Sequence, residues 1–133
     1  MARRALSLLA LALAAVALGA CGDQEFDLEA DETADVRTGA TIFKNKCAGC
    51  HTIEAVGAEG SAVNVRDRER IDGPNFNTRA EEVDQVLYAI RNGGYSGAIM
   101  PENIVTGREA RQVAEFVAKY SAQSAASTGA DGS

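Results

Sequence analysis

The sequence predicts an all-α fold with long loops, and two observations lead to that prediction. Three stretches between residues 36 and 120 repeat apolar residues at the three- and four-residue spacing of an amphipathic helix. No stretch alternates polar and apolar residues strongly enough to indicate a β-strand. Loops this long are unusual in a small domain, and they become reasonable where something other than the chain occupies its centre.

The first expected helix runs from about Val36 to Lys46. Gly39 and Phe43 are four residues apart and therefore share one of its faces.

The second and third expected helices each follow a capping-box pattern. Residues 78–81 (Thr-Arg-Ala-Glu) precede one helix, and the glycines that follow Asn92 end it. Residues 106–109 (Thr-Gly-Arg-Glu) precede the other. The apolar stripes are Val83, Val86, Leu87 and Ile90, and then Val113, Phe116, Val117 and Tyr120.

The first twenty residues have the pattern of a secretory signal peptide. Arg3 and Arg4 are followed by an uncharged apolar run, Ala5–Ala20, which is slightly shorter than the ~20 residues of a membrane-spanning helix. The run ends in Leu-Gly-Ala before Cys21 and resembles a bacterial lipobox, whose cysteine receives diacylglycerol. An ordinary signal peptide and an uncleaved anchor helix stay as alternatives. Each of these possibilities places the domain outside the cytoplasmic membrane, at its outer face or in the periplasm.

The chain is expected to have four parts. Residues 1–20 are the signal peptide, and residues 21–35 are a lipidated cysteine with an acidic linker that lacks Lys and Arg. Residues 36–120 form the folded domain. Residues 121–133 are rich in Ser, Ala and Gly and are expected to be a disordered tail.

Charge narrows the possible partners. Without its first twenty residues the chain has 11 basic and 19 acidic residues, a net charge of −8. A nucleic-acid-binding protein would need a basic face, so no nucleic-acid partner is expected. An acidic surface favours partners with positively charged docking faces.

The segment Cys47-Ala48-Gly49-Cys50-His51 has the spacing of a covalent haem-attachment site. Residues at i, i+3 and i+4 of a helical turn project to nearly the same side, so two thiols can bond to one haem while His51 binds its iron. A zinc site needs four ligands, and a thioredoxin-like pair needs a βαβ setting; the sequence shows neither. A plain disulfide between Cys47 and Cys50 stays possible in an exported protein, but it leaves His51 unexplained.

Met100 is the candidate for the second axial ligand of the iron. It is the only methionine after the signal peptide, and it lies in the loop between the second and third helices. The alternative is that Met100 fills a gap in the core. Weaker candidates for this ligand are Lys44, Lys46 and Lys119. The turn at Gly73-Pro74 offers the Pro74 carbonyl as an acceptor for the second ring N–H of His51.

Together these motifs resemble the class I cytochromes c, and more closely the small membrane-anchored lipoprotein cytochromes of bacteria. The motifs are Gly39-x-x-x-Phe43, Cys47-x-x-Cys50-His51, Gly73-Pro74-Asn75-Phe76 and Met100-Pro101.

The resemblance implies three main helices and long loops around one haem c, with His51 and Met100 on the iron and Gly73 and Pro74 beside it. It also implies crossing terminal helices, with Gly39 at the close approach and Phe43 against Phe116 or Tyr120. The charged run 66–70 matches no family feature and is expected to be solvated surface; a docking patch and a contact with the haem propionates are the alternatives. Weak candidates for contacts with the propionates or Met100 are Tyr88, Arg91, Asn92 and Tyr95.

The expected function follows from the two axial ligands. An iron whose axial positions are both filled has no open site for a substrate, so we expect a one-electron carrier and no enzyme. Methionine ligation raises the reduction potential, which is expected to be positive. A monomer is expected, with partners such as a quinol-oxidising complex and a terminal oxidase. The alternatives are a fixed cytochrome c subunit of a larger oxidoreductase complex and a haem peroxidase.

Overall fold

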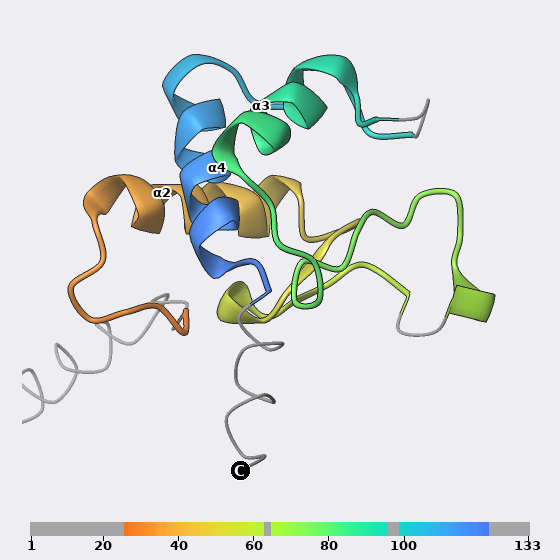
Figure 1. Cartoon of the computed structure of the whole chain (residues 1–133), viewed down its shortest axis with the longest axis horizontal. Helices are drawn as coiled ribbons and strands as arrows, with labels where there is room; N and C mark the ends of the chain where they lie inside the picture. The colour runs from red at the N-terminus through yellow and green to blue at the C-terminus, as the bar shows by residue number, and fades with distance from the viewer. Residues whose placement is uncertain (1–25, 63–64, 96–98, 123–133) are drawn as a thin grey trace, which may run out of the picture.

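The computed structural model describes residues 26–62, 65–95 and 99–122. Its main elements are three helices, α2 (Ala34–Lys46), α3 (Val83–Asn92) and α4 (Gly107–Tyr120). Helix α4 crosses α2 and also packs against α3 (Figure 1). Three helices with very little sheet confirm the predicted fold class. The predicted signal peptide, the lipidated Cys21 and residues 123–133 of the predicted tail lie outside the described residues.

Helix α2 begins two residues earlier than expected. The side chain of Thr33 caps it by accepting a hydrogen bond of 3.2 Å from the backbone N–H of Val36. Asp35 lies in its first turn and Lys44 and Lys46 in its last, where each charge complements the helix dipole.

The capping box predicted at residues 78–81 is wrong. Helix α3 is capped by Glu82, whose backbone N–H donates to the side chain of Gln85 at 2.8 Å. The two residues expected to form the box are engaged elsewhere. The Thr78 hydroxyl donates to the Asn75 carbonyl at 3.3 Å, and the Glu81 carboxylate is buried against Arg79. The predicted end of the helix is confirmed, because Gly93 adopts the left-handed conformation at its C-cap.

The second predicted capping box is also absent. Thr106 is the N-cap of α4 as expected, but its side chain makes no capping hydrogen bond.

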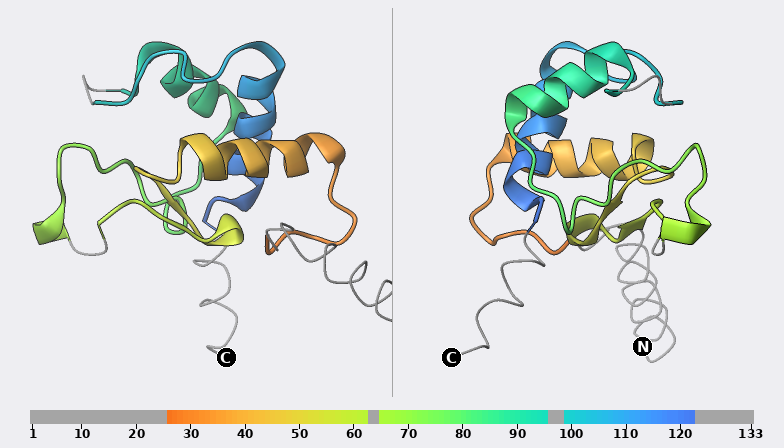
Figure 2. Two further views of the ribbon diagram at one scale, coloured as in Figure 1. Left: turned by 180° about the vertical axis from the view of Figure 1, so that it is seen from behind. Right: turned by 45° about the vertical axis from the view of Figure 1, so that its right-hand side comes forward.

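The crossing of α2 and α4 forms the centre of the core. A Cβ atom at Gly39 would overlap the backbone of Gln112, so only glycine permits this close approach. Phe43 packs against Phe116, with 5.6 Å between the ring centroids. These contacts confirm what the resemblance implied for Gly39 and Phe43. Figure 2 shows that the two helices cross rather than run side by side.

A small hairpin that the sequence did not predict follows the first helix. Strand β1 (Thr52–Ile53) pairs antiparallel with β2 (Ala58–Glu59), with Thr52 opposite Glu59. The short helix η2 (Glu54–Val56) lies between them, and η3 (Val65–Asp67) follows. Strands of two residues are too short to produce a recognisable alternation of polar and apolar residues.

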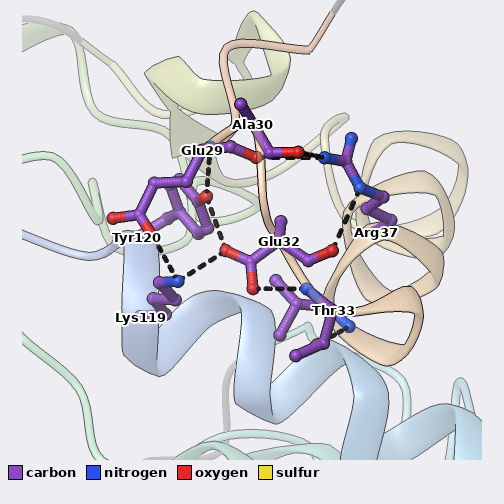
Figure 3. Close-up of polar contacts among 8 residues, drawn as sticks. Glu29, Ala30, Glu32, Thr33, Arg37, Lys119 and Tyr120 are labelled. Atoms are coloured by element: carbon purple, nitrogen blue, oxygen red, sulfur yellow. Dashed lines mark hydrogen bonds and ion pairs between the residues drawn. The ribbon is translucent and has the colours of Figure 1, made fainter.

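The last part of the predicted acidic linker is packed against the domain, whereas the sequence had indicated a solvated segment. We name residues 26–33 the strap, because they lie along the helical domain. Phe26 and Leu28 are partly buried against the core, and the strap also bonds to α4 (Figure 3). Two apolar side chains among the acidic ones give this segment something to bury.

The backbone just after α4 is also fixed to the domain, because the Ala122 N–H donates to the Phe76 carbonyl at 2.7 Å.

No helix among the described residues is long and apolar enough to cross a membrane.

Candidate functional site

A mainly apolar cavity of about 310 Å³ opens between the end of α2, residues 68–76, helix α3 and the loop around Met100. The six residues predicted to bind a cofactor all line it: Cys47, Cys50, His51, Gly73, Pro74 and Met100. Apolar walls are supplied by Phe43, Phe76, Val86, Ile90, Ile104, Val113 and Val117. The structure thus brings together residues that are up to 53 positions apart in the chain.

The cysteine pair lies on a turn that continues from α2. Cys47 is the C-cap of that helix, and its carbonyl accepts hydrogen bonds from the N–H groups of Cys50 at 3.1 Å and His51 at 3.0 Å. No disulfide joins the two cysteines, and Cys50 is exposed. Burial, and secondarily the neighbouring Cys50, raises the pKa of Cys47 to about 11. Cys47 is therefore a neutral thiol at physiological pH.

The imidazole of His51 is oriented by a backbone carbonyl. Its Nδ1 atom lies 3.4 Å from the Pro74 oxygen, so an N–H there donates to that carbonyl and leaves Nε2 as the atom with a lone pair. Burial, partly opposed by the Pro74 carbonyl, lowers the pKa of His51. The neutral ring is the form that binds a metal.

The plane of that ring is set by its two neighbours. A Cβ atom at Gly73 would overlap the His51 ring, so the backbone of residue 73 lies directly against it. The Phe76 ring stacks on the imidazole, with 5.0 Å between centroids and 7° between planes. Gly73 is thus required by the position of His51.

Ser61 is a residue of this site that no motif in the sequence predicts. Its hydroxyl donates to the Pro74 carbonyl at 3.0 Å, and it also accepts from the Thr52 N–H at 3.1 Å. The Thr52 hydroxyl accepts from the Ser61 N–H at 2.9 Å. These bonds fasten the acceptor of His51 to the hairpin. No local pattern identifies Ser61, because its role depends on the unpredicted hairpin.

Met100 contributes to the cavity from another segment of the chain. It is partly buried against the core, and the N–H of Asn103 ties its loop to the Ile90 carbonyl of α3 at 2.8 Å. Two of the lysines considered as ligands are engaged elsewhere: Lys44 donates to the Gly57 carbonyl, and Lys119 pairs with glutamates of the strap. Lys46 lines the cavity.

The cavity rim is more basic than the chain as a whole. Its charged side chains are Lys46, Arg68, Arg70 and Arg79, against Asp72 and Glu81. Since Glu81 is paired with Arg79, an excess of positive charge stays at the mouth. Three exposed apolar side chains also border the cavity: Ile71, Tyr95 and Ile99.

The four weak candidates of the sequence analysis are divided by the structure. Tyr95 lines the cavity. The ring of Tyr88 stacks on the ring of Tyr95, with 5.1 Å between the ring centroids. Tyr88, Arg91 and Asn92 are exposed and lie outside the cavity lining.

The donor set fits a haem better than a bare metal ion. Across the described ranges, no three His, Cys, Asp or Glu side chains are grouped to hold a metal. His51 and Met100 offer one nitrogen and one sulfur, which is too few ligands for an isolated ion but sufficient for the two axial positions of a macrocycle. Two thiols beside an apolar cavity then supply the covalent attachment.

Comparison with known proteins agrees with this chemistry. Residues 34–117 match the model of the family described as "Cytochrome C oxidase, cbb3-type, subunit III". The structure is similar to that of the c-type cytochrome SorU from Sinorhizobium meliloti, with a TM-score of 0.54 and 28% sequence identity. That match covers 68% of this chain and 95% of SorU. No curated protein matches the sequence.

Proposed function

We propose a function for this chain on the premise that it belongs to the c-type cytochrome family described as cbb3-type cytochrome c oxidase subunit III. The proposed function is to carry single electrons between membrane redox complexes. The chain is a class I cytochrome c, and membership of the family implies a covalently bound haem c. The observation that carries the proposal is that His51 and Met100 line the same apolar cavity beside the two cysteines.

In the proposed mechanism, His51 and Met100 would hold the iron of the haem, one through a nitrogen and the other through a sulfur. When bound, haem supplies an iron that gains and loses one electron. Pro74 holds the proton of His51 at Nδ1, and the Gly73 backbone and the Phe76 ring fix the plane of the imidazole. The apolar walls exclude water, which disfavours the additional charge of the oxidised state. With His51 and Met100 both holding the iron, the chain would leave no open site for a substrate, and the chemistry supplied would be the exchange of single electrons.

A visible spectrum and a redox titration of the mature protein test this mechanism. We expect a positive midpoint potential and a near-infrared sulfur-to-iron band in the oxidised protein. Met100→Ala should remove the band and lower the potential. Mass spectrometry should show that the variant still carries the same covalently bound haem as the wild type. A strongly negative midpoint, or binding of carbon monoxide to the reduced wild type, would overturn His51/Met100 ligation and favour a peroxidase.

The proposed partners dock at the cavity mouth. The net charge of the chain favoured partners with positive docking faces, but Lys46, Arg68 and Arg70 at the mouth favour an acidic face. A quinol-oxidising complex as donor and a terminal oxidase as acceptor fit the proposed role.

Charge reversal tests the sign of this docking face. Arg68→Glu with Arg70→Glu should slow electron transfer to the partner and weaken its dependence on salt. Arg91→Glu changes an exposed arginine outside the cavity lining and should leave the rate near wild type. Equal effects of the two changes would contradict docking at the mouth.

The proposed location is the outer face of the cytoplasmic membrane, with a lipid anchor on Cys21. Acyl chains found by mass spectrometry on a mature N-terminal cysteine would support it. Membrane retention of Cys21→Ala after washing without detergent would contradict it.

A fixed subunit of a larger complex is the second candidate, because the matching family is described as an oxidase subunit. Mild solubilisation distinguishes the two. A carrier is expected to separate from other subunits with its redox activity intact, and a fixed subunit to stay with them.

A further inference from the structure

The strap is bonded to the last turn of α4 through two residues (Figure 3). The Tyr120 hydroxyl accepts from the Glu29 N–H at 2.9 Å and donates to the Glu32 carboxylate at 2.7 Å. The Lys119 ammonium lies 2.6 Å from the Glu29 carboxylate and 2.7 Å from that of Glu32. The side chain of Glu32 is 2% exposed. A glutamate so deeply buried needs these partners to stay ionised.

The strap is also held by the rest of the domain. The N–H of Asp27 donates to the Ala55 carbonyl of η2 at 2.9 Å. The Arg37 guanidinium of α2 donates to the carbonyls of Glu29 at 3.0 Å and Ala30 at 2.9 Å. Since bonds occur at the beginning, middle and end of the strap, it is docked along its whole length.

The strap and the cavity mouth lie at opposite ends of the molecule. All the views in Figures 1 and 2 place the orange strap on one side and the green segment around residues 65–72 on the other. Helix α2 runs between them, from the strap to Cys47. Its 13 residues span about 20 Å at 1.5 Å per residue.

We propose that the docked strap shortens the tether, so that the cavity mouth is held away from the membrane surface. This inference rests on the proposed lipid anchor at Cys21. With the strap docked, five Cα steps separate Cys21 from Phe26 and span at most about 17 Å; with the strap released, thirteen steps to Ala34 span about 45 Å. A domain of this size is roughly 30 Å across, so the shorter tether prevents it from turning over.

The docked strap would therefore select partners by the height of their electron-entry site above the membrane. A haem edge held on the far side of the domain reaches electron-entry sites that stand about one domain diameter above the bilayer. The partner class is therefore an integral membrane complex with an acidic docking face at that height. A released strap would let the domain reach sites at many heights.

Energy transfer from a headgroup-labelled lipid to the haem tests the proposal on the mature lipidated chain in vesicles. Time-resolved data should give a narrow distance distribution for wild type and a broad one for Lys119→Gln combined with Tyr120→Phe, which removes the bonds to α4. Arg111→Gln removes a basic charge of the same helix outside the strap and should stay narrow. A Gly-Ser segment inserted after Gly22 leaves the strap intact and should broaden the distribution.

Amide hydrogen exchange separates the docking of the strap from its effect. The Asp27 and Glu29 N–H groups should be protected in wild type and lose that protection in the double variant, whose haem spectrum should be unchanged. Protected amides with a wild-type distribution as broad as that of the insertion variant would overturn the shortened tether, as would unprotected wild-type amides. Absence of acyl chains from the mature protein would overturn the anchor itself, whatever the exchange shows.

Discussion

Different interactions stabilise the two ends of this domain. At the strap end, ionic and hydrogen-bonding side chains satisfy one another, and Glu32 has partners in Lys119, Tyr120 and Thr33. At the cavity end, the chain encloses about 310 Å³ between apolar walls and long loops. The first end is complete within the polypeptide, whereas the second end is completed by a cofactor. Stability at the cavity end should thus depend on haem, and stability at the strap end on pH.

The largest expected effect is loss of the cofactor. Cys47→Ala with Cys50→Ala removes both sites of attachment and leaves the cavity unfilled. Without haem the apolar walls of this open cavity lose the group that they pack against, and we expect a loss comparable to the whole stability of a small domain, roughly 5–15 kcal/mol. We expect the haem-free variant to lack a cooperative thermal transition in far-ultraviolet circular dichroism. A transition at the wild-type temperature would show that the chain alone holds the cavity end together.

Gly39→Ala should have the next largest effect, because it acts on the crossing of α2 and α4 that joins the two ends. The new Cβ atom meets the Gln112 backbone, which has no way to move without separating the helices. We expect a loss of about 3 kcal/mol in urea unfolding. Thr38→Ala, at an exposed position of the same helix, should change the stability by less than about 0.5 kcal/mol. Similar values for both variants would contradict a glycine-dependent crossing.

Tyr120→Phe should act only on the strap end. The ring keeps its contact with Phe116, while the hydroxyl bonds to Glu29 and Glu32 are lost. We expect a destabilisation of about 1.5 kcal/mol with an unchanged reduction potential. Tyr88→Phe, at an exposed ring, is the control and should be neutral. A change of potential in Tyr120→Phe would mean that the two ends are coupled.

The smallest expected effect is a pH dependence at the strap. Burial alone would raise the pKa of Glu32, but hydrogen bonds from Lys119 and Tyr120 hold it below its ordinary value of 4.5. The ionised carboxylate therefore stabilises the fold above about pH 4.5, and this contribution is lost as the pH falls through the lowered pKa. Glu32→Gln should be less stable than wild type at pH 7, by about 1 kcal/mol, and the difference should shrink in acid. Urea unfolding at the two pH values measures it, and a constant difference would exclude Glu32 as the titrating group.

The predictability of the fold depended on how local each signal was. The stripes of α3 and α4 repeat within the helices themselves, so their existence and faces followed from the sequence. The cap of α3 did not, because Thr78 and Glu81 bond to their sequence neighbours Asn75 and Arg79. The Glu81 N–H also donates to the hydroxyl of Ser121, 40 residues away, which only the folded chain supplies. The docking of the strap was missed for the same reason, since Glu29 and Tyr120 are 91 residues apart in sequence.

The candidate site divides in the same way. Cys47, Cys50 and His51 follow one helical turn, and their spacing alone indicates the chemistry. Met100 was found by elimination, as the one methionine after the signal peptide, and the structure adds that it shares a cavity with His51. Ser61 could not be predicted, because its partner Pro74 is brought to it by a hairpin of two-residue strands.

The crossing of α2 and α4 has a further consequence for the order of events during biosynthesis. Gly39 and Phe43 contact residues 112 and 116, which are among the last of the domain to be synthesised. The core therefore cannot close until α4 has been made and, on the proposed export route, has crossed the membrane, so Cys47 and Cys50 are exposed on an open chain until then. Haem can be joined to those thiols in that interval, before closure of the last helix buries Cys47.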